Sequence, residues 1–373
     1  MKNRILIICL GTLLLCFGIL GCSGARSRHD PDVIRNTAKP AFSLGLQQPD
    51  IVVAVSPVRQ TMQIGGSIPT LLGAGITAVQ DNSYAVRVRE ALGDYDPCAV
   101  FLEQMRTHLA TGFSQELTEV SPQGTAAGFA NLREAEAARR EGLRLRGYDT
   151  LLDLELSFGI YGPQGLLAVK AKGELVDLQN DRLLWRNEVA SYSVDLFADV
   201  KWRDPMQRMT PNITAPRFTI EGDAISQWTP DNAAPLRAAF EKAVGDVATA
   251  VLADLGLKES PEGLYTLGAY LLLNGKPESA AEKFTRAIAL SPDMQPAVNG
   301  LAVALAKNKQ IDEAITLAEK LAEAHPDFIP AHYNLAWWYM MEKKDKDKAL
   351  PHYEKAVALG VSPSRRLEKK LGK

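Results

Sequence analysis

Residues 264–292 read LYTLGAYLLLNGKPESAAEKFTRAIALSP, and residues 298–326, beginning 34 residues later, read VNGLAVALAKNKQIDEAITLAEKLAEAHP. The two stretches align without an insertion and carry small or apolar residues at the same offsets. These residues are Leu264, Leu267, Gly268, Leu271, Ala280, Phe284, Ala287 and Pro292 in the first stretch, and Val298, Leu301, Ala302, Leu305, Ala314, Ala318, Leu321 and Pro326 in the second. Their spacing predicts two amphipathic helices per stretch, and the constant period predicts a stack of helix pairs.

A third copy follows, and it differs from the first two by one extra residue. Its first helix carries His332, Leu335, Ala336 and Tyr339, and its second helix carries Ala349, Tyr353 and Ala356 one position late. The extra residue falls within 342–347, which is the predicted turn between the two helices. A turn on the surface can accommodate an insertion without loss of the repeat.

The offsets in these three copies resemble those of the tetratricopeptide repeat (TPR). The resemblance implies an all-α TPR solenoid of three helix pairs over 258–363, in which each pair buries its apolar face only against its neighbours. Leu367 and Leu371 lie at helical spacing in the basic stretch 364–373, which is a possible capping helix.

In repeats of this family, the first helix of each pair lines a concave groove. The positions that this resemblance assigns to partner binding are Tyr265, Asn299, Lys307, Tyr333, Trp337 and Met340. They are mainly aromatic or apolar, so they favour an extended or helical protein segment with bulky apolar side chains over a terminal carboxylate. An alternative is that Tyr333, Trp337 and Met340 pack against the protein's own amino-terminal domain.

A different pattern occupies residues 50–257. Residues 50–55 predict a buried strand, residues 150–158 alternate as a half-buried strand does, and residues 166–192 predict a hairpin that turns at 179–181. Helices are expected at 99–117, 125–146 and 235–255. The sequence therefore predicts an α+β amino-terminal domain with a small, mostly antiparallel sheet.

The order of these elements, with the stretch GELVDLQNDRLLW at 173–185, resembles the α+β domain of several envelope lipoproteins. Members of that group include the curli secretion channel and the activators of penicillin-binding proteins. The resemblance implies that residues 50–257 form a periplasmic domain.

The first residues have the order of charges and apolar residues found in a secretory signal. Lys2 and Arg4 precede the uncharged run 5–21, which is short for a membrane-spanning helix. Residues 19–22, ILGC, resemble the bacterial lipobox, which implies a lipoprotein signal peptide at 1–21 and lipid attachment at Cys22. Ser23 after the cysteine implies the outer membrane, and residues 22–49 are expected to be a flexible tether. The alternative is a simple amino-terminal anchor helix.

Composition limits the other possibilities. The chain has 42 Lys and Arg against 44 Asp and Glu, a net charge of −2, without a block of like charge that would indicate nucleic-acid binding. Cys98 is the one cysteine left after signal removal and lipidation, so no internal disulfide is expected. Residues 73–78, GAGITA, match a dinucleotide-binding pattern but lack the preceding strand. The five histidines show no paired-ligand spacing, and neither a metal, a cofactor nor an enzyme activity is expected.

Two functions fit this organisation. The first is a non-catalytic, lipid-anchored periplasmic adaptor that uses its TPR repeats to bind unidentified envelope proteins. The alternative is an oligomeric structural subunit of an envelope secretion or transport complex, in which the α+β domain assembles and the repeats decorate the assembly.

Overall fold

The computed structural model describes residues 34, 36–55, 71–122, 132–200 and 222–373. The expected signal peptide 1–21 and Cys22 lie outside these residues. The strands are β1 (Pro40–Leu46), β2 (Val52–Ala54), β3 (Thr118–Glu119), β4 (Thr150–Tyr161), β5 (Leu166–Asp177) and β6 (Arg182–Tyr192). The helices before the repeats are α3 (Leu71–Leu92), α4 (Pro97–Ala110), α5 (Leu132–Leu145) and α6 (Pro230–Asp254). None of the described helices is both long and apolar enough to cross a membrane.

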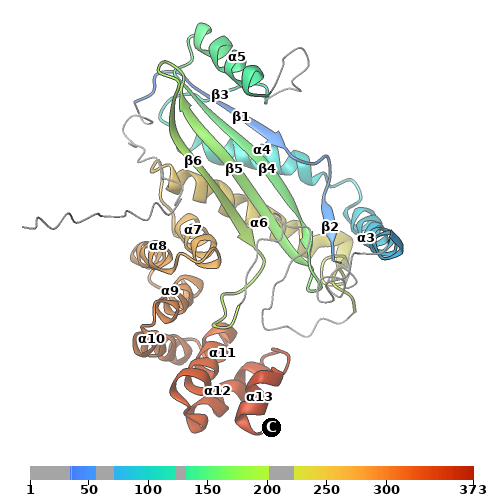
Figure 1. The fold of residues 1–373 in the computed structure, drawn as a ribbon, viewed down its shortest axis with the longest axis vertical. Helices are drawn as coiled ribbons and strands as arrows, with labels where there is room; N and C mark the ends of the chain where they lie inside the picture. Colours follow the sequence, from blue (N-terminus) through green and yellow to red (C-terminus); the bar gives the residue numbers. More distant parts are fainter. Residues whose placement is uncertain (1–33, 35, 56–70, 123–131, 201–221) are drawn as a thin grey trace, which may run out of the picture.

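The strands form one mixed sheet in the order β3-β1-β4-β5-β6, with β2 also paired to β4 (Figure 1). The expected hairpin is present, since β4, β5 and β6 pair antiparallel. The prediction of a mostly antiparallel sheet was wrong, because β1 pairs parallel to β4 and to β3, and β2 pairs parallel to β4.

The source of this error is β1, which lies inside the expected tether 22–49. Residues 40–44 are buried, so the tether cannot extend to residue 49. The strand is short, contains Gly45 and begins at Pro40, and these residues are typical of turns and linkers. Its pairing with β4 over seven residues satisfies its backbone groups and places it inside the sheet.

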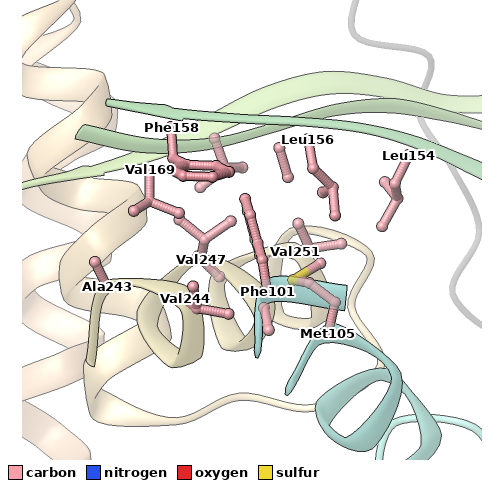
Figure 2. Packing of buried hydrophobic residues seen from close by; sticks show 14 of the residues in the cluster. Phe101, Met105, Leu154, Leu156, Phe158, Val169, Ala243, Val244, Val247 and Val251 are labelled. Atoms are coloured by element: carbon pink, nitrogen blue, oxygen red, sulfur yellow. The ribbon is translucent and has the colours of Figure 1, made fainter. Parts of the chain in front are cut away.

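Helices α4 and α6 cover one face of the sheet (Figure 1). Phe101 of α4, Phe158 of β4 and Phe240 of α6 meet there, with ring centroids 5.0 to 5.9 Å apart. Figure 2 shows Phe101 and Phe158 among Val169, Val247 and other apolar side chains of the same core. These aromatic contacts fix the long helix α6 against the sheet.

One of the expected helices is shorter than predicted, and another begins where the sequence places it. Helix α4 begins at Pro97, where the Asp96 carboxylate accepts hydrogen bonds from the backbone N–H groups of Cys98 and Ala99, and it ends at Ala110 rather than 117. Residues 231–233 have left-handed backbone angles, so the regular part of α6 begins near Pro235, as the sequence predicts. Helix α5 lies across one end of the opposite sheet face (Figure 1).

The carboxyl-terminal region is helical: α7 (Pro261–Leu273), α8 (Pro277–Leu290), α9 (Gln295–Lys307), α10 (Ile311–Ala324), α11 (Ile329–Trp338), η1 (Tyr339–Lys343), α12 (Lys346–Ala358) and α13 (Arg365–Leu371). Each helix from α7 to α11 packs against the next one, and α11 packs against α12. The stack starts on α6, which contacts α7.

The extra residue of the third copy is accommodated as a wider helical turn. Residues 339–343 form a π-helix, which holds one more residue per turn than an α-helix, and Lys344 then takes a left-handed conformation. Leu367 and Leu371 of α13 are buried at the end of the stack.

Gly300 tests the packing of the first two helix pairs. A Cβ at this position would lie 2.6 Å from two ring atoms of Phe284, which also packs against Gly268. Gly300→Ala should therefore lower the melting temperature, with a cost of about 1–3 kcal/mol for overpacking. Gly142→Ala is the control, because a Cβ there meets nothing within 4 Å and a helix gains roughly 0.5–1 kcal/mol from the change. Equal melting temperatures for the two variants would contradict this packing.

Candidate functional site

The chain that leaves β6 enters the helical stack. Residues 194–200, VDLFADV, run from the end of β6 to α11 (Figure 1) and are called here the docked segment. Its buried members, Leu196, Phe197 and Val200, belong to the same hydrophobic cluster as the repeat helices. It contacts first helices of the predicted pairs, α9 and α11, at positions that the sequence assigns to the groove, and this surface is called the groove below.

Two asparagine side chains bind the backbone of the docked segment. Asn334 accepts a hydrogen bond from the Ala198 N–H (2.6 Å) and donates one to the Leu196 carbonyl (3.2 Å). Asn299 donates to the same carbonyl (2.8 Å), and Asn334 donates to the Asn299 side-chain oxygen (2.9 Å). Both asparagines are buried, at 2% and 0% exposure. A carboxamide donates and accepts as a peptide group does, so the pair recognises main chain without regard to sequence.

The side chains of Leu196 and Phe197 provide the apolar part of the contact. Both are buried, and the Phe197 ring meets the Tyr333 ring edge to face, with centroids 5.3 Å apart. An aromatic pair in this geometry adds about 0.5–1.5 kcal/mol to the free energy of burial. Phe197 is therefore the main apolar anchor of the docked segment.

Asp199 provides the charged part of the contact between the docked segment and the repeat helices. Its Oδ2 atom accepts a hydrogen bond from the Tyr333 hydroxyl at 3.2 Å, while its Oδ1 atom is buried without a hydrogen-bond partner. Burial raises the pKa of the Asp199 carboxyl, and the Tyr333 hydroxyl and the charges of Arg366 and Lys307 oppose this shift. Desolvation lowers the pKa of Lys307, and the charge of Asp199 opposes that change. The carboxylate is thus held in a cationic environment but is incompletely paired.

The structure brings three of the six predicted groove residues to the docked segment. Asn299 and Tyr333 hydrogen-bond to the docked segment, and Lys307 lies near Asp199. Trp337 is buried beneath the Arg366 guanidinium, which lies 4.8 Å from its ring centroid, and Met340 is buried in the same cluster. Of the three residues in the alternative left open by the sequence, Tyr333 contacts Phe197 and Asp199 of the amino-terminal part of the chain, whereas Trp337 contacts Arg366 of α13. Binding of an external partner here is a proposal.

Tyr265 lies farther along the groove, beside a cavity of about 340 Å³ between the sheet end, α6 and α7. Asp246 and Lys242 of α6 line the same cavity and form an ion pair at 2.7 Å. Burial raises the pKa of Asp246, and the Lys242 ammonium opposes that shift.

Asn334 was not predicted from the sequence. The positions 34 and 68 residues before it are Gly300 and Thr266, so no repeated polar residue marks the site. A carboxamide in the otherwise apolar stretch AHYNLAWWY, at 331–339, is the signal that could have indicated a buried polar contact.

A second arrangement missed from the sequence is a histidine pair. His332 of α11 and His352 of α12 place their Nδ1 atoms 3.1 Å apart, and the His332 Nε2 atom is 2.9 Å from the Pro326 carbonyl. The geometry fits two neutral rings, with His332 Nε2 donating to Pro326 and His352 Nδ1 donating to His332. Burial lowers the pKa of both rings, and the neighbouring His332 lowers that of His352 further.

Among the described residues, no group of three or more His, Cys, Asp or Glu side chains is arranged to hold a metal ion. The histidine pair joins α11 and α12. Within those same residues, Cys98 is a free thiol at the start of α4.

Residues 271–337 match the sequence model of the tetratricopeptide repeat, and residues 329–359 match a second model of the same repeat. The carboxyl-terminal helices are tetratricopeptide repeats. The matched ranges begin inside α7, so a first repeat that starts at 258 stays a prediction. No match to an enzyme family was found, and TPR repeats are in general non-catalytic interaction scaffolds. No curated protein matches the chain.

Solved structures similar to the chain include YrrB and MamA. YrrB, described as "a TPR protein with an unusual peptide-binding site", is 24% identical, with 37% of this chain and 76% of YrrB covered and a TM-score of 0.29. MamA is 25% identical, with 34% of this chain and 68% of MamA covered and a TM-score of 0.26. A MamA double mutant is 26% identical, with 37% and 75% covered and a TM-score of 0.29.

The histidine pair predicts how stability depends on pH. Folding lowers the pKa of both rings below the ordinary value of 6.5, so the unfolded chain binds more protons as the solution is acidified. The contribution of the two neutral rings to the stability of the folded state is therefore present above pH 6.5 and is lost as the pH falls below that value. The melting temperature should fall more between about pH 7.5 and about pH 5.5 in the wild type than in a His332→Gln, His352→Gln double variant. Parallel pH profiles for the two proteins would show that the pair is not held neutral.

Proposed function

We propose that this protein is a non-catalytic, lipid-anchored periplasmic adaptor that binds extended segments of envelope proteins in its TPR groove. The observation that carries the proposal is the hydrogen bonding of Asn299 and Asn334 to the backbone of residues 196–198. A groove that satisfies peptide groups with side-chain amides can accept an extended polypeptide, because every such ligand offers the same groups. The tetratricopeptide repeats support a role in protein–protein interaction.

The anchoring part of the proposal rests on the sequence. A lipid-modified Cys22 would hold the chain at the periplasmic face of the outer membrane, since two or more acyl chains give a stable anchor. Because Ile34 and Thr37 are buried and the sheet begins with β1 at Pro40, the tether in this proposal comprises residues 22–33. The α+β domain and the groove would then lie a short distance from the membrane surface.

Lipid attachment has a direct test. Cys22→Ala should abolish incorporation of labelled palmitate and release the protein from the membrane fraction of envelope preparations. Cys98→Ala is the matched control and should behave as the wild type, since this thiol lies at the start of α4. Continued palmitate labelling of the Cys22→Ala protein would exclude the lipoprotein assignment.

Partner binding can be tested by photocrosslinking in cells. A photoreactive amino acid at Lys307, which is exposed and near Asp199, should crosslink to an envelope protein. The same amino acid at Lys320, an exposed position on α10, is the control and should give little of that product. We expect a difference of at least about tenfold, because binding energy is concentrated in a few groove residues. The same product in equal yield from both positions would refute partner binding in the groove.

A further inference from the structure

The docked segment occupies the groove by contacts of two kinds. The asparagine pair binds its backbone, which another peptide could replace, while Phe197 and Asp199 make the contacts that depend on side-chain type. Residues 197–200 form a turn in which the Val200 N–H donates to the Phe197 carbonyl. A ligand that replaces the docked segment must therefore supply a backbone that can turn in the same way, a large apolar side chain for the Tyr333 ring and a carboxylate two residues later.

The docked segment is also an imperfect ligand. The Asp199 Oδ1 atom is buried without a hydrogen-bond partner, which is unfavourable relative to a paired oxygen, and more so for a charged one. Burial raises the pKa of this carboxyl even though Arg366 and Lys307 lie near enough to oppose the shift. A separate peptide is not constrained by the connection to β6, so it can place its carboxylate closer to these cations and remove the penalty.

The connection to β6 favours the docked segment in another way. The segment begins two residues after Tyr192, the last residue of β6, so it is always close to the groove. A short connection of this kind gives an effective concentration on the order of millimolar, with which any separate ligand must compete.

From these observations we infer that residues 194–200 are an internal ligand of the TPR groove, displaced by a partner with the same chemistry. That partner is an acidic peptide segment that can form the same turn, with a Leu-Phe pair or an equivalent bulky apolar pair and a carboxylate two residues after the aromatic side chain. The inference rests on the proposed function, in which the groove binds protein segments, and adds both the chemistry of the partner and the competition that it meets.

The test uses a fluorescent peptide with the sequence of residues 192–201, YSVDLFADVK, and the full chain. Phe197→Ala weakens the internal ligand and leaves the groove intact, so fluorescence anisotropy should show at least about tenfold tighter binding of the peptide than to the wild type. Phe113→Ala, which removes a partly buried phenylalanine of the other core, is the control and should bind as the wild type does. Equal affinity for wild type and Phe197→Ala would overturn the inference.

A second variant covers the case in which Phe197→Ala does not fold. Asp199→Lys places a cation beside Lys307 and Arg366, so repulsion should expel the docked segment without removing an apolar side chain. It should also bind the peptide at least about tenfold more tightly than the wild type.

In the peptide itself, replacement of the residue corresponding to Phe197 by alanine should weaken binding by at least about tenfold. An unchanged affinity of that peptide would overturn the assigned chemistry.

The outcomes separate this inference from the proposed function. If the peptide fails to bind either variant while Lys307 still crosslinks to an envelope protein, the internal-ligand inference is wrong and the adaptor function stands. If the peptide binds the variants as expected but no groove-specific crosslink forms in cells, the adaptor function is wrong.

Discussion

The burial of residues 196–198 depends on the pairing of their backbone groups with two asparagine carboxamides. A segment outside a helix or sheet has N–H and C=O groups without regular partners, and burying them unpaired costs more than the apolar side chains readily offset. Asn299 and Asn334 provide those partners, and Asn334 also donates a hydrogen bond to the Asn299 side-chain oxygen. The segment can therefore cross an apolar groove, and β6 can lead directly from the sheet into the TPR helices.

Two further contacts hold the groove in place relative to the sheet. Asp254, at the end of α6, accepts hydrogen bonds from the Trp185 and Asn187 side chains of β6. Tyr270 of α7 donates to Glu188, which also pairs with Lys170 of β5. Helix α6 packs on both the sheet and α7. It therefore holds the end of β6 close to the TPR helices. Because the docked segment follows β6 directly, its position in the groove depends on where β6 ends.

The parts of the fold that the sequence predicts are those with a local pattern. The 34-residue period places small residues at helix contacts, and the hairpin β5–β6 follows from alternating residues around a polar turn. Strand β1 was missed because its partner β4 lies about a hundred residues away, and parallel pairing leaves no turn in the sequence.

The groove was predicted from the repeat register, but its occupant was not. The family resemblance assigns Asn299 and Tyr333 to the groove, whereas Asn334 has no counterpart in the earlier repeats. The docked segment and the histidine pair are contacts between residues 20 to 138 positions apart, and single side chains of this kind leave no periodic signal.

Amide hydrogen exchange across residues 194–200 of the full chain tests the central claim most directly. If the docked segment is held as described, the Ala198 amide should exchange slowly in the wild type. In an Asn334→Ala variant this amide should exchange faster by at least about tenfold, while α9 and α10 remain protected. Rapid exchange at Ala198 in the wild type, at the rate of an unprotected loop, would contradict the claim that the groove is occupied by the protein's own chain.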